Sequence, residues 1–303
     1  MKPRHAALAV AVAAVWGVAF VMIEVGLRSF PPLLFSCLRF AVAAVPALLF
    51  LGGPRVAWRW VFAVGLVLGV AKFGLEFTSM STGMPAGLSS LVLQCQVIFT
   101  VLIATVVLRE RPRPAQVGGI AVAAVGIALI AVDHGLHGPF TAFGLMIAAG
   151  ACWGLSNVIT RYASPPDALR FVVWVSAVAV LPLLALSLLV EGPGAIVVAL
   201  SSLSWTGASA VAYVAWGATL FGFGAWGFLL RTYDTGTVAP FSLLVPVTGM
   251  LSAWLVLGEA LTPLRCAAGA LIVAGTAATV LTPRAAHRVA APAAPEAHPV
   301  PAA

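Results

Sequence analysis

The chain has 303 residues, of which 62% are hydrophobic and only 8% are Asp, Glu, Lys or Arg, whereas a soluble domain carries about 25% charged residues. Sixteen basic and nine acidic side chains cannot cover such a body in water, so the lipid bilayer must surround most of it. The net charge of +7 lies in short connectors without a basic stripe, which argues against a nucleic-acid partner. The four isolated cysteines exclude a disulfide scaffold and form no metal or redox motif.

Ten hydrophobic runs are long enough to cross a hydrocarbon core of about 30 Å, which needs about 20 residues per helix. They lack the strict alternation of a barrel strand, so the sequence predicts ten membrane-spanning helices. In chain order these are expected near residues 6–26, 33–52, 60–79, 85–108, 115–132, 142–161, 169–190, 206–230, 237–257 and 264–281. The apolar stretch within connector 191–205 is too short to span, and an interfacial segment is one interpretation of it. The Ala- and Pro-rich tail 282–303 is expected to be disordered.

The basic residues predict the orientation, because translocation disfavours Lys and Arg in short loops. One set of alternate connectors and termini carries twelve of them: Lys2, Arg4, Arg55, Arg59, Arg109, Arg111, Arg113, Arg161, Arg170, Arg231, Arg284 and Arg288. The other set carries only Arg28 and Arg265. Both termini are therefore expected in the cytoplasm, which requires an even number of spans.

Two internal repeats are visible in the sequence. Ala14-Val15-Trp16-Gly17 in the first span corresponds to Ala151-Cys152-Trp153-Gly154 in the sixth. Val107-Leu108-Arg109-Glu110 aligns without gaps on Val256-Leu257-Gly258-Glu259. Each repeat has five helices, and because five is odd the second enters the membrane from the opposite face. Inverted repeats are typical of transporters, with the substrate site near the midplane between them.

At these residues the chain resembles the drug/metabolite transporter (DMT) superfamily, specifically its proteins with two EamA repeats. The characteristic pieces are the Trp-Gly near the start of each repeat, Arg39-Phe40 in the second span, and the Glu-x-x-x-Pro elements at 110–114 and 259–263. The resemblance implies an EamA-like repeat at 6–132 and an inverted one at 142–281. It also implies export of a small metabolite, amino acid or drug across the bacterial inner (plasma) membrane, and it implies no cofactor.

Three charged residues within the spans are expected to meet. At about 1.5 Å per residue, Arg39, Lys72 and Glu76 lie roughly 9, 12 and 6 Å below the same membrane surface. Lys72 and Glu76 also share a helix face, because they are four residues apart. A charge in hydrocarbon costs about 2.5 to 3.5 kcal/mol, so these groups should pair. They form either a polar wall of the translocation path or a structural ion-pair network.

The remaining candidates for the substrate site are aromatic, amide and proline residues. An aromatic stripe is expected along the eighth span, and the two repeat-equivalent Trp side chains are expected on opposite walls of one cavity. Gln94 and Gln96 point to opposite sides of their helix, so at most one easily faces that cavity. For each of these candidates, a role in helix packing is the alternative to a role in the substrate site. The set comprises Trp16, Gln94, Trp153, Asn157, Tyr213, Trp216 and Pro246, the last as a mark of irregular backbone in the ninth span.

The sequence contains no recognisable enzyme motif. It also lacks a nucleotide-binding loop, which excludes built-in ATP drive and leaves a secondary carrier or facilitator. The leading prediction is alternating-access export of a small organic solute, with proton coupling as one option. A lipid-modifying intramembrane enzyme is an alternative, in which Glu24 and Glu76 form the one acidic pair within the spans. A non-transporting membrane scaffold is another. The sequence does not indicate the substrate or the oligomeric state.

Overall fold

The computed structural model describes residues 1–135 and 138–281. This part of the chain is helical, as the sequence predicts, and contains no strand. Nine of its helices are long and apolar enough to cross a membrane, and a shorter apolar helix, α2 (Pro32–Leu48), makes the tenth hydrophobic helix. The expected disordered tail lies outside the described residues.

The first five hydrophobic helices follow the predicted spans closely. Some are made of consecutive helical pieces without a connector between them. Their pieces are α1 (Pro3–Leu27), α2, α3 (Trp58–Val64), η1 (Gly65–Lys72), α4 (Phe73–Ser81), α5 (Ala86–Val92), α6 (Cys95–Val107) and α7 (Pro114–Gly135).

The second five repeat this arrangement. Their pieces are α8 (Phe140–Ala163), α9 (Ala168–Val190), α11 (Trp205–Ala212), η2 (Tyr213–Phe221), α12 (Gly222–Thr232), α13 (Thr235–Val238), η3 (Ala239–Leu243), α14 (Leu244–Leu257) and α15 (Pro263–Leu281).

One boundary differs from the sequence prediction, and one predicted connector contains a short helix. The second helix ends at Leu48 instead of near residue 52, because Gly52, Gly53 and Pro54 follow and disfavour a helix. The connector expected at 191–205 contains a helix, α10 (Pro193–Ser201), whose nine residues are too few to cross a bilayer.

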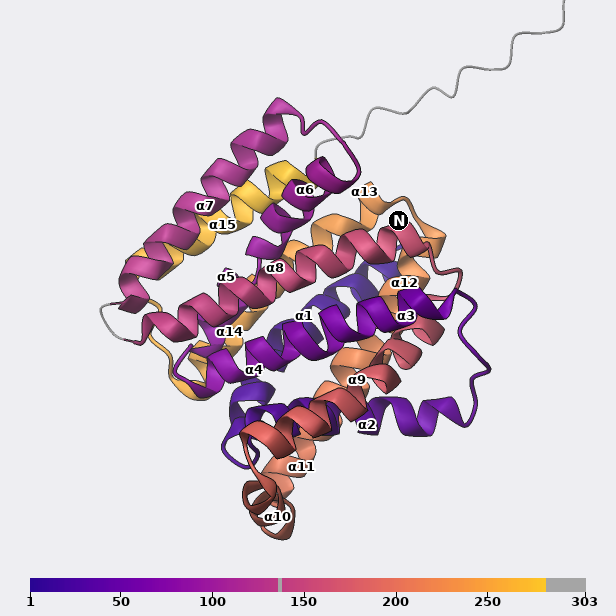
Figure 1. Ribbon diagram of the computed structural model, residues 1–303. Coiled ribbons are helices and arrows are strands. Elements are labelled where there is room, and N and C mark those ends of the chain that lie inside the picture. Colours follow the sequence, from indigo (N-terminus) through magenta and orange to yellow (C-terminus); the bar gives the residue numbers. More distant parts are fainter. Residues whose placement is uncertain (136–137, 282–303) are drawn as a thin grey trace, which may run out of the picture.

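The helices pair in a pattern that is unchanged when the two halves are exchanged. The fifth helices, α7 and α15, pack on each other and lie side by side in Figure 1, and the second helices, α2 and α9, also pair. The first helix of each half packs on the fourth helix of the other, α1 on α14 and α8 on α6. This exchange of partners is the arrangement expected of two five-helix repeats.

Glycine allows the closest of these approaches. In the α7–α15 pair, a Cβ added to Gly119 would stand 2.6 Å from the carbonyl oxygen of Gly275, and one added to Gly275 would stand 2.4 Å from that of Gly119. Such distances are far below van der Waals contact, so side chains here would force the helices apart. Small residues that let helix backbones approach are typical of membrane proteins.

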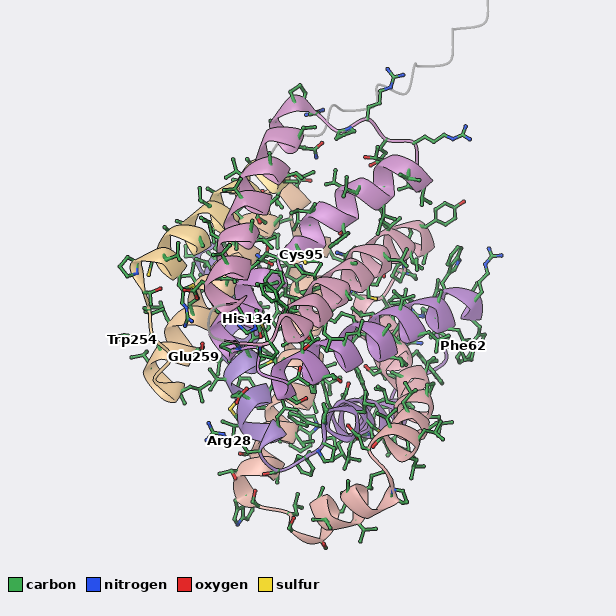
Figure 2. All side chains as sticks on the ribbon, turned by 60° about the vertical axis from the view of Figure 1, so that its left-hand side comes forward. Arg28, Phe62, Cys95, His134, Trp254 and Glu259 are labelled. Carbon is green, nitrogen blue, oxygen red and sulfur yellow. The ribbon has the colours of Figure 1, made fainter. Side chains whose placement is uncertain are left out.

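The helices end in two sets of connectors, named here after the repeat-equivalent acids that mark them. The Glu259 end holds the connectors α1–α2, α4–α5, α7–α8, α9–α11 and α14–α15. The Glu110 end holds the N-terminus and the other connectors. Figure 2 shows Arg28, His134 and Glu259 toward one end and Phe62 toward the other, with Cys95 between them.

Both halves interrupt their helices at corresponding places. The third helix of each half contains a π-helical segment, η1 or η2. The fourth helix of each half is broken, between α5 and α6 at Leu93–Gln94 and at the 3₁₀ segment η3 before α14. The offset of 149 positions that aligns Glu110 with Glu259 also aligns the first residue of α6, Cys95, with the first residue of α14, Leu244. Such irregular turns are frequent at functional sites.

Candidate functional site

A buried ion pair occupies the third helix of the first half. Lys72 ends η1 and Glu76 lies in the first turn of α4, and the Lys72 Nζ stands 2.5 Å from the Glu76 Oε2. Their side chains are only 4% and 2% exposed. The Lys72 Nζ also lies 3.5 Å from the ring centroid of Phe73 and 4.6 Å from that of Trp153 in α8. The four-residue spacing thus yields a contact between opposite charges in the membrane interior.

Arg39 of α2 brings a third charge to this layer. Its Nε donates a hydrogen bond to the Thr219 Oγ1 in η2 at 3.1 Å, which joins the two halves of the molecule. Its Cζ lies 3.9 Å from the ring centroid of Phe73, so this ring contacts both Arg39 and Lys72. Glu76 is close enough to interact electrostatically with both cations. The structure therefore brings together the three residues that depth along the helices placed in one layer.

The two repeat-equivalent tryptophans pack on the third helix of the opposite half. The Trp16 indole N–H donates to the carbonyl oxygen of Ala218 at 2.9 Å, and the ring lies 5.4 Å from Phe223 and 5.3 Å from Trp226, centroid to centroid. Trp153 instead faces the Lys72 ammonium. Their surroundings thus differ, since one Trp lies among aromatic rings and the other beside the charged layer. Lining of a single cavity by both stays a prediction.

An amide cluster lies one turn along α8 from Trp153. The Asn157 Nδ2 donates to the Gln96 Oε1 at 2.7 Å and to the Thr100 Oγ1 at 3.1 Å, which joins α8 to α6. Gln94 does not belong to this cluster and lies buried at the break between α5 and α6. The two glutamines thus separate as their spacing predicts, and Gln96 is the one that reaches Asn157.

The eighth helix does not present its aromatic residues as one stripe. The Tyr213 hydroxyl donates to the carbonyl oxygen of Val15 in α1, whereas the Trp216 indole N–H donates to that of Val42 in α2. Trp216 is also 53% exposed. The two residues lie in the π-helical segment η2, whose wider turn takes residues three apart off a common face.

Pro246 lies directly after the irregular backbone of the ninth helix. The 3₁₀ segment η3 ends at Leu243, and Pro246 is the third residue of α14. The residue is buried, and the Pro246 carbonyl oxygen accepts a 3.4 Å hydrogen bond from the Ser90 Oγ. A proline is tolerated in the first turn of a helix, because no intrahelical acceptor is available there.

Sequence reasoning missed Thr219 and Phe73 as members of the charged layer. Thr219 is a single hydroxyl in an apolar run, 180 positions from Arg39, and nothing in the sequence links the two. Phe73 follows Lys72 directly and reads as an ordinary core residue. Aromatic residues beside intramembrane charges are the signal that could have pointed to Phe73.

Two glutamates at the Glu259 end cap helices of the other half. The Glu259 carboxylate accepts hydrogen bonds from the backbone N–H groups of Ala86 at 2.7 Å and Gly87 at 3.0 Å, at the start of α5. Glu191 does the same for Leu33 and Leu34 in the first turn of α2, at 2.6 and 3.1 Å. Unpaired N–H groups and the helix dipole favour negative charge at these positions.

The Glu259 carboxyl is partly buried between the two halves. Burial raises its pKa above the ordinary value of 4.5, while the two backbone donors and Arg265 act in the opposite direction. Arg265 itself pairs with Asp133 of α7, Nε to Oδ2 2.7 Å. The repeat-equivalent Glu110 instead forms an exposed salt bridge with Arg161. Hence the same sequence element makes a buried cap at one end and a surface ion pair at the other.

A family model described as the EamA-like transporter family matches residues 4–132 and again 141–281. The chain belongs to this family. The two matches follow the two five-helix halves of the structure, and membership confirms the resemblance seen in the sequence. EamA-like proteins are transporters and not enzymes, so the family sets aside the lipid-modifying enzyme considered above.

Curated relatives are similar over nearly the whole EamA-like chain. Proteins named "Probable amino-acid metabolite efflux pump" from Salmonella typhimurium and Escherichia coli are 40% and 37% identical over 282 and 281 residues. Each alignment covers 91% of this chain and 94% of the relative. A "Probable terminal-alkyne amino-acid exporter" from Streptantibioticus cattleyicolor is 29% identical, over 86% of this chain and 88% of the relative.

A solved crystal structure shows the same fold. It superposes with a TM-score of 0.60 at 22% identity and covers 93% of this chain and 98% of its own. At this identity the likeness concerns the fold alone. The family match and the curated relatives show that the EamA-like chain is a multi-pass membrane transporter for small solutes, in keeping with the prediction from its sequence.

Proposed function

We propose that this protein exports amino acids or metabolites derived from them across the inner membrane. The observation that carries the proposal is the buried layer of Arg39, Lys72, Glu76 and Thr219, which lies between the two halves and holds opposite charges. A zwitterionic solute presents one carboxylate and one ammonium group, so such a layer matches it chemically. The names of the relatives from Salmonella typhimurium and Escherichia coli support the same substrate class.

Transport proceeds by alternating access between the repeats 6–132 and 142–281. The caps formed by Glu191 and Glu259 and the Asp133–Arg265 pair hold the halves together at the Glu259 end. We propose that the Glu110 end and both termini lie in the cytoplasm, because the twelve basic residues favour that side. Export then requires these contacts to open outward while the Glu110 end closes. The candidate path also includes Trp16, Gln94, Trp153, Asn157, Tyr213, Trp216 and Pro246.

Proton exchange is the coupling that we propose. Reconstituted protein tests both parts of the proposal. Proteoliposomes are loaded with each of a panel of labelled amino acids and cationic dyes, and efflux is followed with and without an inwardly directed proton gradient. Efflux of amino acids that the gradient accelerates supports the proposal. Efflux of dyes alone, or no efflux of any amino acid, contradicts the substrate class, and gradient-independent efflux contradicts the coupling.

A further inference from the structure

The Arg39 guanidinium is the least compensated charge of the buried layer. The side chain is only 4% exposed, yet among the described residues no carboxylate oxygen lies within 4.0 Å of its nitrogens. Lys72 and Glu76 neutralise each other at 2.5 Å. The layer therefore carries one positive charge in excess. A buried charge without a partner is strongly unfavourable, so a binding partner is expected for it.

The unused hydrogen-bonding capacity of Arg39 indicates what this partner is. A guanidinium has five N–H donors, and in the described structure only Nε is bonded, to Thr219. The terminal nitrogens have no hydrogen bond there and are not among the fully buried unpaired atoms, so they keep some accessible surface. The Phe73 ring, with its centroid 3.9 Å from Cζ, stabilises the positive charge but accepts no hydrogen bond in the guanidinium plane.

Thr219 fixes the direction of this free edge. Its Oγ1 donates to the carbonyl oxygen of Val214 at 2.8 Å, which leaves an oxygen lone pair to accept from the Arg39 Nε. The hydroxyl thus holds one edge of the guanidinium and leaves the terminal nitrogens for a ligand. Planar guanidinium and carboxylate groups fit each other through paired N–H···O bonds.

From this geometry we infer that the free edge of Arg39 is the receptor for the carboxylate of the transported solute. This deepens the proposed function and rests on it: the carrier selects solutes with a carboxylate and rejects the corresponding amides and amines.

Competition measurements test this selectivity. For each amino acid that wild-type proteoliposomes transport, the matching amide and decarboxylated amine are used as inhibitors of its flux. Both analogues are expected to inhibit at least about tenfold more weakly than the unlabelled amino acid, since a charge-assisted bidentate contact is lost. In Arg39→Gln this preference should disappear, and in Arg39→Lys only part of it should remain. The exposed Arg55→Gln is the matched control for loss of one positive charge.

A second variant and a second measurement cover the case in which Arg39→Gln fails to fold. Thr219→Val keeps the guanidinium but removes its hydrogen-bond acceptor, and should weaken the preference for carboxylates in a folded protein. Sodium propionate should also raise the melting temperature of the purified wild type more than propionamide does, and this difference should be smaller in Arg39→Lys.

The outcomes separate this inference from the proposed function. Equal inhibition by amino acid, amide and amine in the wild type overturns the inference while export stands. An undiminished preference in a folded Arg39→Gln, or in Thr219→Val where Arg39→Gln does not fold, also overturns it. Absence of amino-acid flux together with stabilisation by propionate refutes the proposed function and keeps the carboxylate site. Absence of both refutes the two together.

Discussion

The Lys72–Glu76 pair can be tested by removing its acid. Glu76→Gln leaves Lys72 and Arg39 buried without a negative partner, and breaking a buried pair typically costs about 3 to 5 kcal/mol. We therefore expect a large fall in the melting temperature of the purified protein, in its transport, or in both. Normal flux per folded molecule in a poorly folding variant would identify the pair as structural. A folded but inactive carrier would identify it as part of the path, and wild-type behaviour would exclude both.

Trp153 is expected to affect substrate affinity more than a peripheral tryptophan does. Its ring lies 4.6 Å from the Lys72 Nζ, whereas Trp58 packs on Trp174 at the Glu110 end. If the Trp153 ring lines the path as proposed, Trp153→Ala removes an aromatic face that attracts a cationic or apolar group of the solute by about 0.5 to 2 kcal/mol. The half-saturating concentration of flux should rise by about twofold to thirtyfold, and Trp58→Ala should leave it unchanged. An equal effect of both substitutions, or none from either, would place the path elsewhere.

In the packing of α7 on α15, replacement of Gly119 should destabilise the protein, whereas replacement of the adjacent Gly118 should not. A Cβ on Gly119 would clash with α15, whereas a Cβ on Gly118 meets nothing within 4 Å. Gly119→Ala is expected to lower stability by about 1 to 3 kcal/mol through overpacking. Gly118→Ala should be neutral or gain up to about 1 kcal/mol of helix propensity. Melting temperatures of the two purified variants give the comparison, and equal values would contradict the α7–α15 packing.

The cap that Glu259 places on α5 should contribute a pH-dependent stability. Folding raises the pKa of this acid through burial, so the folded protein binds the proton more readily than the unfolded chain. The contribution of Glu259 is therefore fully present below its ordinary pKa of 4.5 and falls as pH rises through the raised pKa. Loss of the cap in Glu259→Ala should cost about 0.5 to 2 kcal/mol near pH 4.5 and less at neutral pH.

The repeat-equivalent Glu110 supplies the control for this measurement. Its salt bridge with Arg161 is exposed, so Glu110→Ala should cost no more than about 1 kcal/mol. Melting temperatures of the wild type and both variants between pH 4.5 and 8 give the comparison. A cost of Glu259→Ala that grows with rising pH would show that the two backbone hydrogen bonds outweigh the burial of the carboxylate.

The orientation that we propose from the basic residues can be checked by labelling. Ser201 and Arg55 are exposed at the Glu259 and Glu110 ends respectively, so cysteines at these positions should lie on opposite sides of the membrane. In a variant without Cys37, Cys95, Cys152 and Cys266, a membrane-impermeant maleimide applied to intact spheroplasts should label Ser201→Cys. Arg55→Cys should react only after permeabilisation. Same-side labelling would overturn the ten-span topology.

Much of the fold could be predicted because the bilayer makes hydrophobic length a strong signal. Each long run had to satisfy its own backbone hydrogen bonds as a helix, and the predicted spans match the observed helices to within a few residues except at the end of α2. The repeated Trp-Gly and Glu-x-x-x-Pro elements added the five-helix units and the family. The meeting of Lys72 with Glu76 followed from helical spacing alone.

The sequence by itself therefore determined the class, the number of hydrophobic helices and the position of each charge along its helix, since these depend on distance along a single helix. Only the tertiary structure decided which partners meet across the two halves. Arg39 is hydrogen-bonded to Thr219, Asn157 to Gln96, and Glu259 to the backbone at the start of α5. It also decided that η1 and η2 depart from α-helical geometry, which moved Tyr213 and Trp216 onto different neighbours. The physical reason is that packing against other helices decides which face of a helix meets which neighbour. The surrounding lipid is alike on all sides of a helix and does not select one face.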